Sequence, residues 1–273
     1  MKNKILLTTS IVIYNPNLVD LEILFKSYKV SLLKAQIEYD IHSKITIVDN
    51  NSKGNYSDQV KLMLDNADIN YEYIYSIKNG GYGYGHNQAI LKESSDYHII
   101  CNPDIEFFED TISNAIDYMQ IYSDISLITP AVFGKDNERH FLCKRNPKLF
   151  HLFLRRFVSN KIKGRFFKTY LERFEFRDKS YEQIIENIPF CTGCFMFFSM
   201  EVLKQLNGFD ERFFMYMEDA DLSRRAMKFG RNIYLPSCRV IHRWERGAYK
   251  NKKLRNEAIK SAFKYWRKWG GLF

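Results

Sequence analysis

The sequence predicts an α/β fold with a mainly parallel central β-sheet. In the first half of the chain, short apolar runs alternate with segments whose apolar residues recur at helical spacing, and polar residues follow several of the runs. Such alternation is typical of parallel sheets, whose ligands bind outside the carboxyl ends of the strands. We therefore expect the polar residues that follow these strands to line one cleft.

The expected elements of the first half follow one another along the chain. Each expected strand is a run rich in apolar, β-branched or aromatic residues, and each expected helix spaces its apolar residues three or four positions apart. The strands are Ile5–Tyr14, Lys44–Val48, Tyr71–Ser76 and Tyr97–Cys101, and the helices are Leu18–Leu33, Tyr56–Leu64 and His86–Lys92. The polar or glycine-rich segments between them are Asp49–Ser52, Gly80–Gly85 and Asn102–Asp104.

The second half opens on a strongly basic segment. Residues 139–179 hold thirteen Lys or Arg against three Asp or Glu, interleaved with Phe, Leu and Tyr, and we interpret them as an insertion or an appended helical element. After this segment we expect a strand at Phe190–Val202, a short helix within Met215–Gly230 and a basic aromatic helix at Leu254–Trp269.

The composition fits one large folded domain. The chain has 273 residues, of which 45% are hydrophobic and 27% charged, and this excludes a disordered chain, a collagen-like repeat and a small disulfide scaffold. A net charge of +9 with 22 Phe and 18 Tyr favours an anionic partner: nucleic acid, a phospholipid surface or a phosphorylated small molecule. Five scattered cysteines favour a reducing compartment.

The N-terminal apolar run imitates a signal peptide, but Thr8, Thr9 and Ser10 interrupt it and no small-residue cleavage site follows. No stretch reaches the roughly 20 apolar residues that a membrane-spanning helix needs. The sequence thus predicts no spanning helix and leaves open that the protein lies on a membrane surface.

Two turns are candidates for chemistry, although each also has a plain structural explanation. Asn102-Pro-Asp104 places a carboxylate at a strand end, where a single Asp is commonly only a turn former. Gly81, Gly83 and Gly85 let the backbone approach a ligand, and the helix that follows offers N–H groups to a phosphate. The alternative is a flexible tight turn, since the loop lacks the Lys of a phosphate-binding P-loop.

Three carboxylates mark the start of the helix expected within Met215–Gly230. Glu218, Asp219 and Asp221 directly follow a run of apolar residues. Acidic residues in a first turn often only stabilise the helix, by up to about 1 kcal/mol each. Three of them at this place indicate a function, and we expect such a carboxylate to stay ionised at neutral pH, as a general base must.

His242 follows a short strand-like run near the end of the second half. A lone His is more often a packed surface residue than a ligand. Paired with Asp104, it would supply the mixed nitrogen and oxygen ligands that Mg²⁺ or Mn²⁺ accepts. Cys191 and Cys194 have the spacing of half a zinc site, but no second pair stands at the required distance, so we interpret them as core or loop cysteines.

Taken in order, these motifs resemble the inverting GT-A glycosyltransferases of family 2, and among them the O-antigen and cell-wall rhamnosyltransferases. The resemblance covers about residues 5–245. The motifs that carry it are Ser10-Ile-Val-Ile-Tyr-Asn15, Ile47-Val-Asp-Asn-Asn-Ser52, Asn79-Gly-Gly-Tyr-Gly-Tyr-Gly-His-Asn87, Asn102-Pro-Asp104, Gly193-Cys-Phe-Met196, Asn207-Gly-Phe-Asp210, Tyr216-Met-Glu-Asp-Ala-Asp-Leu222 and Ile241-His242.

The resemblance implies a GT-A, Rossmann-like fold of the kind that binds nucleotide-diphospho-sugars across a mainly parallel sheet. It implies that Tyr14, in the loop after the first strand, and Asp49 hold the nucleoside. It also implies that Gly81, Gly83 and Asn87 flank the sugar diphosphate.

The same resemblance assigns the chemistry. Asn102 and Asp104 would contact the donor, and Asp104 would bind Mg²⁺ or Mn²⁺ together with His242. Asp219 would be the general base, with Glu218 beside it. A metal neutralises the charge of the leaving nucleotide diphosphate, and inversion by single displacement needs a base on the opposite face of the sugar.

The implied reaction transfers L-rhamnose from dTDP-L-rhamnose to a hydroxyl of a polyprenyl-diphosphate-linked saccharide, for O-antigen or capsule synthesis at the cytoplasmic face of the bacterial membrane. The alternatives are a galactofuranosyl- or hexosyltransferase that uses a UDP- or GDP-sugar, and a non-catalytic basic module that binds nucleic acid or membrane. We expect no nucleic-acid partner, because acidic residues gather around the expected cleft. A nucleotidyltransferase would need a basic loop at residues 11–17, and this chain has none there.

We expect a catalytic domain at residues 1–245, which includes the basic insertion, and a C-terminal basic helical extension at residues 246–273. Both basic segments are threaded with aromatic residues, as in interfacial amphipathic elements. Those of the insertion are Phe141, Phe150, Phe153, Phe157, Phe166 and Phe167. The sequence thus predicts salt-sensitive binding to an anionic membrane surface without insertion; the alternative is that the aromatics are core and the charges a solvated rim.

Overall fold

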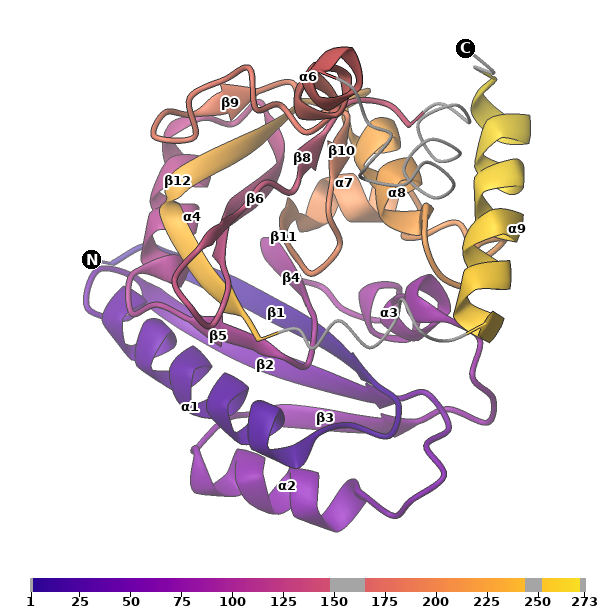
Figure 1. The fold of residues 1–273 in the computed structure, drawn as a ribbon. Coiled ribbons are helices and arrows are strands. Elements are labelled where there is room, and N and C mark those ends of the chain that lie inside the picture. The colour runs from indigo at the N-terminus through magenta and orange to yellow at the C-terminus, as the bar shows by residue number, and fades with distance from the viewer. Residues whose placement is uncertain (1, 148–164, 244–251, 271–273) are drawn as a thin grey trace.

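The computed structural model describes residues 2–147, 165–243 and 252–270. A ten-stranded sheet lies at its centre, in the order β3-β2-β1-β4-β11-β6-β12-β5, with β7 joined to β6 and β9 to β12, while β10 and β8 form a separate pair (Figure 1). The strands are β1 (Lys4–Ile13), β2 (Asp40–Asp49), β3 (Tyr71–Tyr75), β4 (Tyr97–Cys101), β5 (Ile105–Phe107), β6 (Ile125–Phe133), β7 (Arg139–His140), β8 (Cys143–Lys144), β9 (Ile185–Glu186), β10 (Phe190–Cys191), β11 (Phe195–Ser199) and β12 (Arg231–His242). The helices are α1 (Leu18–Ala35), α2 (Ser57–Asn66), α3 (Tyr82–Ile90), α4 (Thr111–Ile121), α6 (Arg165–Phe174), α7 (Met200–Gln205), α8 (Glu218–Ala226) and α9 (Lys252–Trp269).

The N-terminal half of the sheet has the predicted parallel arrangement. Strand β1 pairs in parallel with β2 and β4, and β2 with β3. The register sets Ile13 beside Asp49, and Asp49 beside Tyr75, so these strands end at one edge of the sheet. One core cluster packs β1 against α1, α2 and α4, and a second joins β4 and β11 to α7 and α8. Helices on both faces explain why the middle of β1 is buried on both sides, Thr8, Thr9 and Ser10 included.

Strand β11 interrupts the parallel order. It lies antiparallel between β4 and β6, so it begins at the edge where β4 ends. The expected continuous strand Phe190–Val202 is therefore wrong: the chain forms β10, turns at Gly193, forms β11 and enters α7 at Met200. Gly193 breaks the apolar run, and Met200, Val202 and Leu203 are spaced to bury one face of a helix.

Helix α3 begins at Tyr82, four residues before the predicted start at His86. Gly81, with a φ of +99°, supplies the left-handed backbone that precedes the helix. Gly83 lies inside the helix. A Cβ at this position would come 2.7 Å from the Cβ of Phe209, so a glycine is needed there. This segment is thus the start of a tightly packed helix and not the flexible tight turn considered as the alternative, and its glycines serve that packing.

The basic segment 139–179 is partly built into the fold. Strand β7 pairs with β6, and β8 with β10. The ring of Phe141 meets that of Tyr181 edge-on at 4.9 Å, with Arg177 over its other side. The predicted interfacial residues Phe150, Phe153 and Phe157 lie outside the described residues. Within the ranges that are described, no helix is both long and apolar enough to cross a membrane.

A buried polar network joins α3 to the sheet. Ser10 lies between two histidines, with its Oγ 2.7 Å from His86 Nδ1 and 2.8 Å from His98 Nε2, and Thr8 Oγ1 lies 2.7 Å from His98 Nδ1. Both histidines are fully buried. Burial lowers the pKa of His98 to about 3 and that of His86 well below its usual value. The network therefore holds two neutral imidazoles.

These imidazoles should destabilise the fold in acid. Below a pH of about 6.5, these histidines become protonated in the unfolded chain but stay neutral in the folded chain. Each should therefore lower the free energy of unfolding by about 2 kcal/mol between pH 7 and pH 5. His98→Gln should flatten this dependence in urea titrations at the two pH values. The exposed His42 is the matched control, and His42→Gln should leave the slope unchanged; an unchanged slope in His98→Gln would contradict the prediction.

Candidate functional site

The turn Asn102–Asp104 and the end of β12 meet at the carboxyl edge of the sheet. Strand β12 pairs antiparallel with β5, which sets His242 beside Ile105. The backbone N–H of Arg243 donates to the carbonyl of Asp104 at 2.9 Å. These bonds bring His242 Nε2 to 3.2 Å from Asp104 Oδ1. The two residues predicted to share a metal ion are thus neighbours, although 138 positions separate them in the sequence.

The carboxylate of Asp104 and the imidazole of His242 fit a divalent ion that a bound ligand also coordinates. Two atoms that bind one octahedral ion at about 2.1 Å and at a right angle lie about 3 Å apart, close to the separation of Asp104 Oδ1 and His242 Nε2. In the part of the chain that the structure describes, no group of three or more His, Cys, Asp or Glu gathers into a metal site. An ion here would complete its shell with water and phosphate oxygens, as Mg²⁺ commonly does.

The environment of His242 favours its cationic form in the absence of an ion. Burial alone would lower the pKa of the imidazole, but the neighbouring Cys194 sulfur and the Asp104 carboxylate outweigh it and raise the pKa to about 10. A divalent ion would have to displace this proton, because only the neutral imidazole binds a metal, and the Asp104 carboxylate would then face the ion instead.

A divalent ion should therefore bind at Asp104 and His242. We expect Mn²⁺ to raise the melting temperature of the wild type, and Asp104→Ala to abolish that rise, because the pair loses its only carboxylate. Transfer activity should vanish in EDTA and return with Mn²⁺ or Mg²⁺. Asp136→Ala, which removes an exposed carboxylate in the turn between β6 and β7, is the control. Full activity in EDTA would remove the metal from the mechanism.

Gly193 connects this pair to the carboxylates of α8. The backbone N–H of Gly193 donates to Asp219 Oδ2 at 3.0 Å, and the next residue accepts from Asn102, whose N–H lies 2.9 Å from the Cys194 carbonyl. A Cβ on Gly193 would come 3.1 Å from the Cβ of Asp219. The hydroxyl of Tyr82 donates to the Gly193 carbonyl. The structure thus brings Asn102, Asp104, His242 and Asp219 around the start of β11.

Glu218 and Asp219 lie in different surroundings. Glu218 is 5% exposed, and its Oε2 has no hydrogen-bond partner among the described residues. Burial, reinforced by Asp219, raises the pKa of Glu218 to about 8, so this environment disfavours the ionised form of the carboxylate. Burial also raises the pKa of Asp219, but Lys144 and the Gly193 N–H oppose the shift. Asp219 is therefore the better proton acceptor near neutral pH.

Asp221, the third carboxylate, has no room to act as a base. It is fully buried and accepts from Arg225 and from Trp269. Its role is structural.

The residues expected to flank a diphosphate make mostly internal contacts. Asn87 is 3% exposed and gives both amide protons away, to the Phe209 carbonyl and to Glu211, each at 2.9 Å. A Cβ on Gly81 would come 2.0 Å from the Phe214 carbonyl oxygen. Asn87, Gly81 and Gly83 therefore help to fix the loops around Phe209 and Phe214. The sequence pattern did not predict this structural role.

The residues expected at the nucleoside lie where β1 and β2 end. Asp49 is buried and accepts from the Ser52 N–H at 2.7 Å and from the Tyr73 hydroxyl at 2.9 Å, so it orders the loop. Tyr14 is 46% exposed at the same edge. Sequence reasoning did not consider Tyr75 and Ile77, which are 59% and 88% exposed there; their place at the end of β3 and just after it was the available signal. With Tyr14 they form an exposed, mainly apolar surface at this edge of the sheet.

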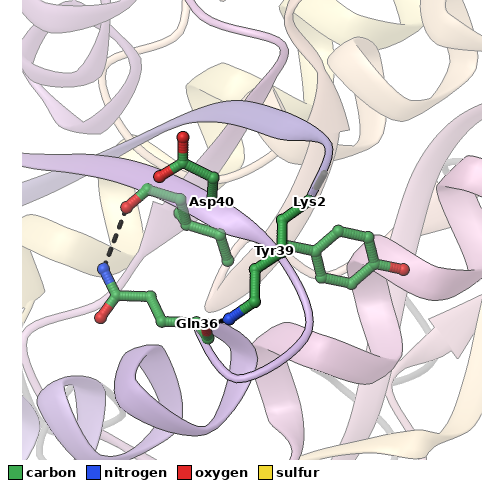
Figure 2. Close-up of a pocket in the computed structure, with 5 residues that line it drawn as sticks. Lys2, Gln36, Tyr39 and Asp40 are labelled. Atoms are coloured by element: carbon green, nitrogen blue, oxygen red, sulfur yellow. Dashed lines mark hydrogen bonds between the residues drawn. The ribbon is translucent and has the colours of Figure 1, made fainter.

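A cavity of about 530 Å³ lies at the opposite edge of the parallel strands. Figure 2 shows it beside Lys2, Gln36 and Asp40, where β1 and β2 begin. Lys2 donates to the Gln36 carbonyl at 2.8 Å. None of the residues brought together around Gly193 lines it, so it is separate from the candidate active site.

Comparison with known sequences now identifies the family. The profile of glycosyl transferase family 2 matches residues 29–206, well over half of the chain. The chain belongs to glycosyl transferase family 2. A second profile, the N-terminal domain of galactosyltransferase, matches residues 177–247, the part that carries Gly193, Asp219 and His242.

Curated relatives of this family 2 chain are similar at modest identity. The N-acetylglucosaminyl-diphospho-decaprenol L-rhamnosyltransferase of Mycobacterium tuberculosis is 26% identical over 176 residues, which span 60% of this chain and 56% of the relative. The match thus covers little more than half the length of that relative. Rhamnosyltransferase WbbL of Escherichia coli K12 is 28% identical over 227 residues, 80% of this chain and 79% of the relative.

Solved structures confirm the predicted GT-A fold. Mannosyltransferase PcManGT from Pyrobaculum calidifontis, in complex with GDP-Man and Mn²⁺, superposes with a TM-score of 0.61 at 14% identity, over 99% of this chain and 67% of its own. GalNAc-T7, with UDP, GalNAc and Mn²⁺, gives 0.65 at 11% identity, over 97% and 48%. At these identities the likeness establishes the fold.

Proposed function

We propose that this chain is an inverting glycosyltransferase that moves L-rhamnose from dTDP-L-rhamnose to a hydroxyl of a polyprenyl-diphosphate-linked saccharide in bacterial surface polysaccharide synthesis. The observation that carries the proposal is the convergence of the Asp104–His242 pair and Asp219 on the start of β11. The names of the mycobacterial and E. coli relatives support the sugar and the lipid-linked acceptor.

The arrangement supports a single displacement. A divalent ion at Asp104 and His242 would neutralise charge on the diphosphate leaving group. Asp219 would take the proton of the acceptor hydroxyl as that oxygen attacks the anomeric carbon, while the bond to the diphosphate breaks on the opposite face. The Gly193 N–H at 3.0 Å fixes the orientation of the Asp219 carboxylate and leaves lone pairs of the acid for the hydroxyl proton.

A galactofuranosyl- or hexosyltransferase is the second candidate, because the galactosyltransferase profile matches residues 177–247. Such an enzyme would use the same ion and base with a UDP- or GDP-sugar. The two candidates differ at the nucleoside end of the cleft, where Tyr14 and Tyr75 are exposed.

Nucleotide preference separates these candidates. With Mn²⁺ present, dTDP should raise the melting temperature more than UDP or GDP, and product mass should show transfer from dTDP-L-rhamnose onto a lipid-diphosphate saccharide. Tyr14→Ala should weaken the response to every nucleotide, because stacking on a base is insensitive to its identity. A clear preference for UDP would replace rhamnose by galactofuranose or a hexose.

Asp219→Asn should lower kcat by about 10²–10⁴-fold, because the amide keeps the shape but accepts no proton. Donor binding by calorimetry should change little. Since burial raises the pKa of Asp219, the acid limb of the wild-type pH–rate profile should lie at higher pH than an ordinary aspartate would give, and activity should fall as the carboxylate protonates.

Asp58→Asn, an exposed carboxylate in the first turn of α2, is the control for this substitution and should leave kcat unchanged. If Asp219→Asn keeps more than about a tenth of the wild-type turnover, the base lies elsewhere.

We further propose peripheral attachment to an anionic membrane through the outer face of α9. Ile259 and Phe263, one turn apart, are 41% and 56% exposed, and Arg255, Lys260 and Arg267 are exposed on the same helix. An apolar ridge flanked by cations suits a surface of anionic headgroups. This face would bring the cleft to a lipid-linked acceptor.

The protein should co-sediment with vesicles that contain phosphatidylglycerol at low salt and release at high salt, because headgroup attraction decays over a Debye length. Phe263→Ala should weaken co-sedimentation. Leu62→Ala, on α2 and similarly exposed, should not. Absence of binding at low salt would mean that the acceptor comes to an enzyme free of the membrane.

A further inference from the structure

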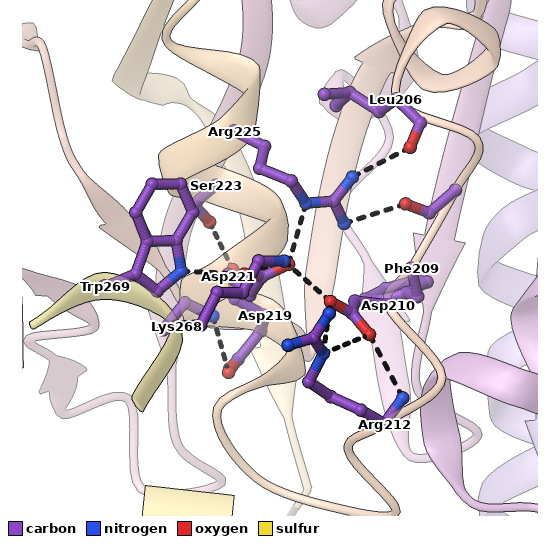
Figure 3. Close-up of polar contacts among 12 residues, drawn as sticks. Leu206, Phe209, Asp210, Arg212, Asp219, Asp221, Ser223, Arg225, Lys268 and Trp269 are labelled. Carbon is purple, nitrogen blue, oxygen red and sulfur yellow. Dashed lines mark hydrogen bonds and ion pairs between the residues drawn. The ribbon is translucent and has the colours of Figure 1, made fainter. Parts of the chain in front are cut away.

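A fully buried carboxylate joins α9 to the helix that carries the candidate base. Asp221 is 0% exposed, and its Oδ2 accepts from Arg225 at 2.7 Å. Its Oδ1 meets two groups from the end of α9: Lys268 Nζ at 2.6 Å and Trp269 Nε1 at 2.8 Å. Figure 3 shows these side chains converging on Asp221. The charge of this acid is thus balanced by one cation from its own helix and one from α9.

The same cations also hold the loop that leads into α8. Lys268 Nζ lies 2.6 Å from Asp210 Oδ2, so one ammonium bridges the carboxylates of Asp210 and Asp221. Arg225 donates to the carbonyls of Leu206 and Gly208 at 2.9 and 2.8 Å. The loop and the helix are therefore fixed to each other by a network of charge-assisted bonds away from solvent.

The backbone before α8 needs such support. Tyr216 and Met217 have φ values of +71° and +68°, in the left-handed region that is unfavourable for residues with side chains. Met217, at the N-cap, supplies no side-chain hydrogen bond to the helix. Further along α9, Ser261 donates to the Met215 carbonyl at 2.8 Å and Lys264 to the Arg212 carbonyl at 2.6 Å. Helix α9 thus braces the strained entry from outside.

Asp219 and Asp221 stand two positions apart and so point to different sides of α8. Asp219 faces Gly193 and Asp221 faces α9. Because the helix is rigid over this one turn, a shift at Asp221 moves the Asp219 carboxylate relative to β11.

We propose that Lys268 and Trp269 are positioning residues that hold Asp219 in its reactive orientation through Asp221. The inference rests on the proposed function in taking Asp219 as the base, and it assigns to the end of α9 a part in the turnover of the enzyme. Lys268 supplies the charge that balances Asp221, and Trp269 supplies an oriented N–H donor.

The test compares Lys268→Met, Lys268→Arg and Trp269→Phe in the full chain. Lys268→Met should lower kcat at least about tenfold, because misplacing a reacting group by about 1 Å costs up to about 10²-fold, while the KM for the donor stays within about threefold of the wild type. Lys268→Arg should keep most of the activity because it keeps the charge. Trp269→Phe keeps an aromatic ring but loses the N–H and part of the contact area of the indole. Because it removes no charge, its loss of kcat should be smaller than that of Lys268→Met.

Lys26→Met, on an exposed turn of α1, is the matched control and should match the wild type. Amide hydrogen exchange gives a second readout that needs no activity: in Lys268→Met, residues 216–222 should exchange faster while β1 and β4 stay protected. If kcat in Lys268→Met stays within twofold of the wild type, or if 216–222 keep their protection, the proposal is wrong. If the wild type transfers no sugar from any donor, the proposed function fails, and the exchange result alone decides whether α9 holds α8.

Discussion

The candidate active site depends on one constraint, the antiparallel placement of β11 within a mostly parallel sheet. A strand that runs against its neighbours begins at the edge where they end, so Gly193 and Cys194 lie among the loops that follow β4 and β12. Gly193 then contributes backbone alone: its N–H reaches Asp219, its carbonyl accepts from Tyr82, and a Cβ would crowd Asp219. With a larger residue here, α8 would have to move away from the Asp104–His242 pair.

The three carboxylates at the start of α8 show how environment divides roles that the sequence leaves equal. Glu218 is enclosed and its pKa rises to about 8, whereas Asp221 is neutralised by two cations. Of the three, only Asp219 is partly exposed, and its Oδ2 accepts from the Gly193 N–H. Carboxylates that are close together in the chain thus differ in how readily they bind a proton. This difference is the physical basis for assigning one of them as the base.

What the sequence predicted well was set by local pattern. The parallel strands β1 to β4, the helices α1 and α9, and the pairing of Asp104 with His242 followed from apolar periodicity, strand ends and the family resemblance. What it predicted poorly was set by distant neighbours. The side-chain amide of Asn87 donates to the Phe209 carbonyl and to Glu211. Position 83 needs a glycine because Phe209 packs against it. Neither partner can be found from residues near these positions in the chain, so the start of the helix was predicted at His86 and not at Tyr82.

Only part of the net charge of +9 is available to a partner, because some of the cations pair with acids inside the protein. Lys268 and Arg225 are committed to buried acids inside the molecule, and Arg231 pairs with Asp124 and Glu186. Arg255 and Arg267, by contrast, remain on the exposed face of α9 around Ile259 and Phe263, and Lys260, also exposed, pairs with Glu257. One helix therefore presents cations to the protein on one face and to solvent on the other. Because α9 contacts Asp221 on one side and faces solvent on the other, the proposed membrane-binding face and the proposed support of the candidate base belong to one helix.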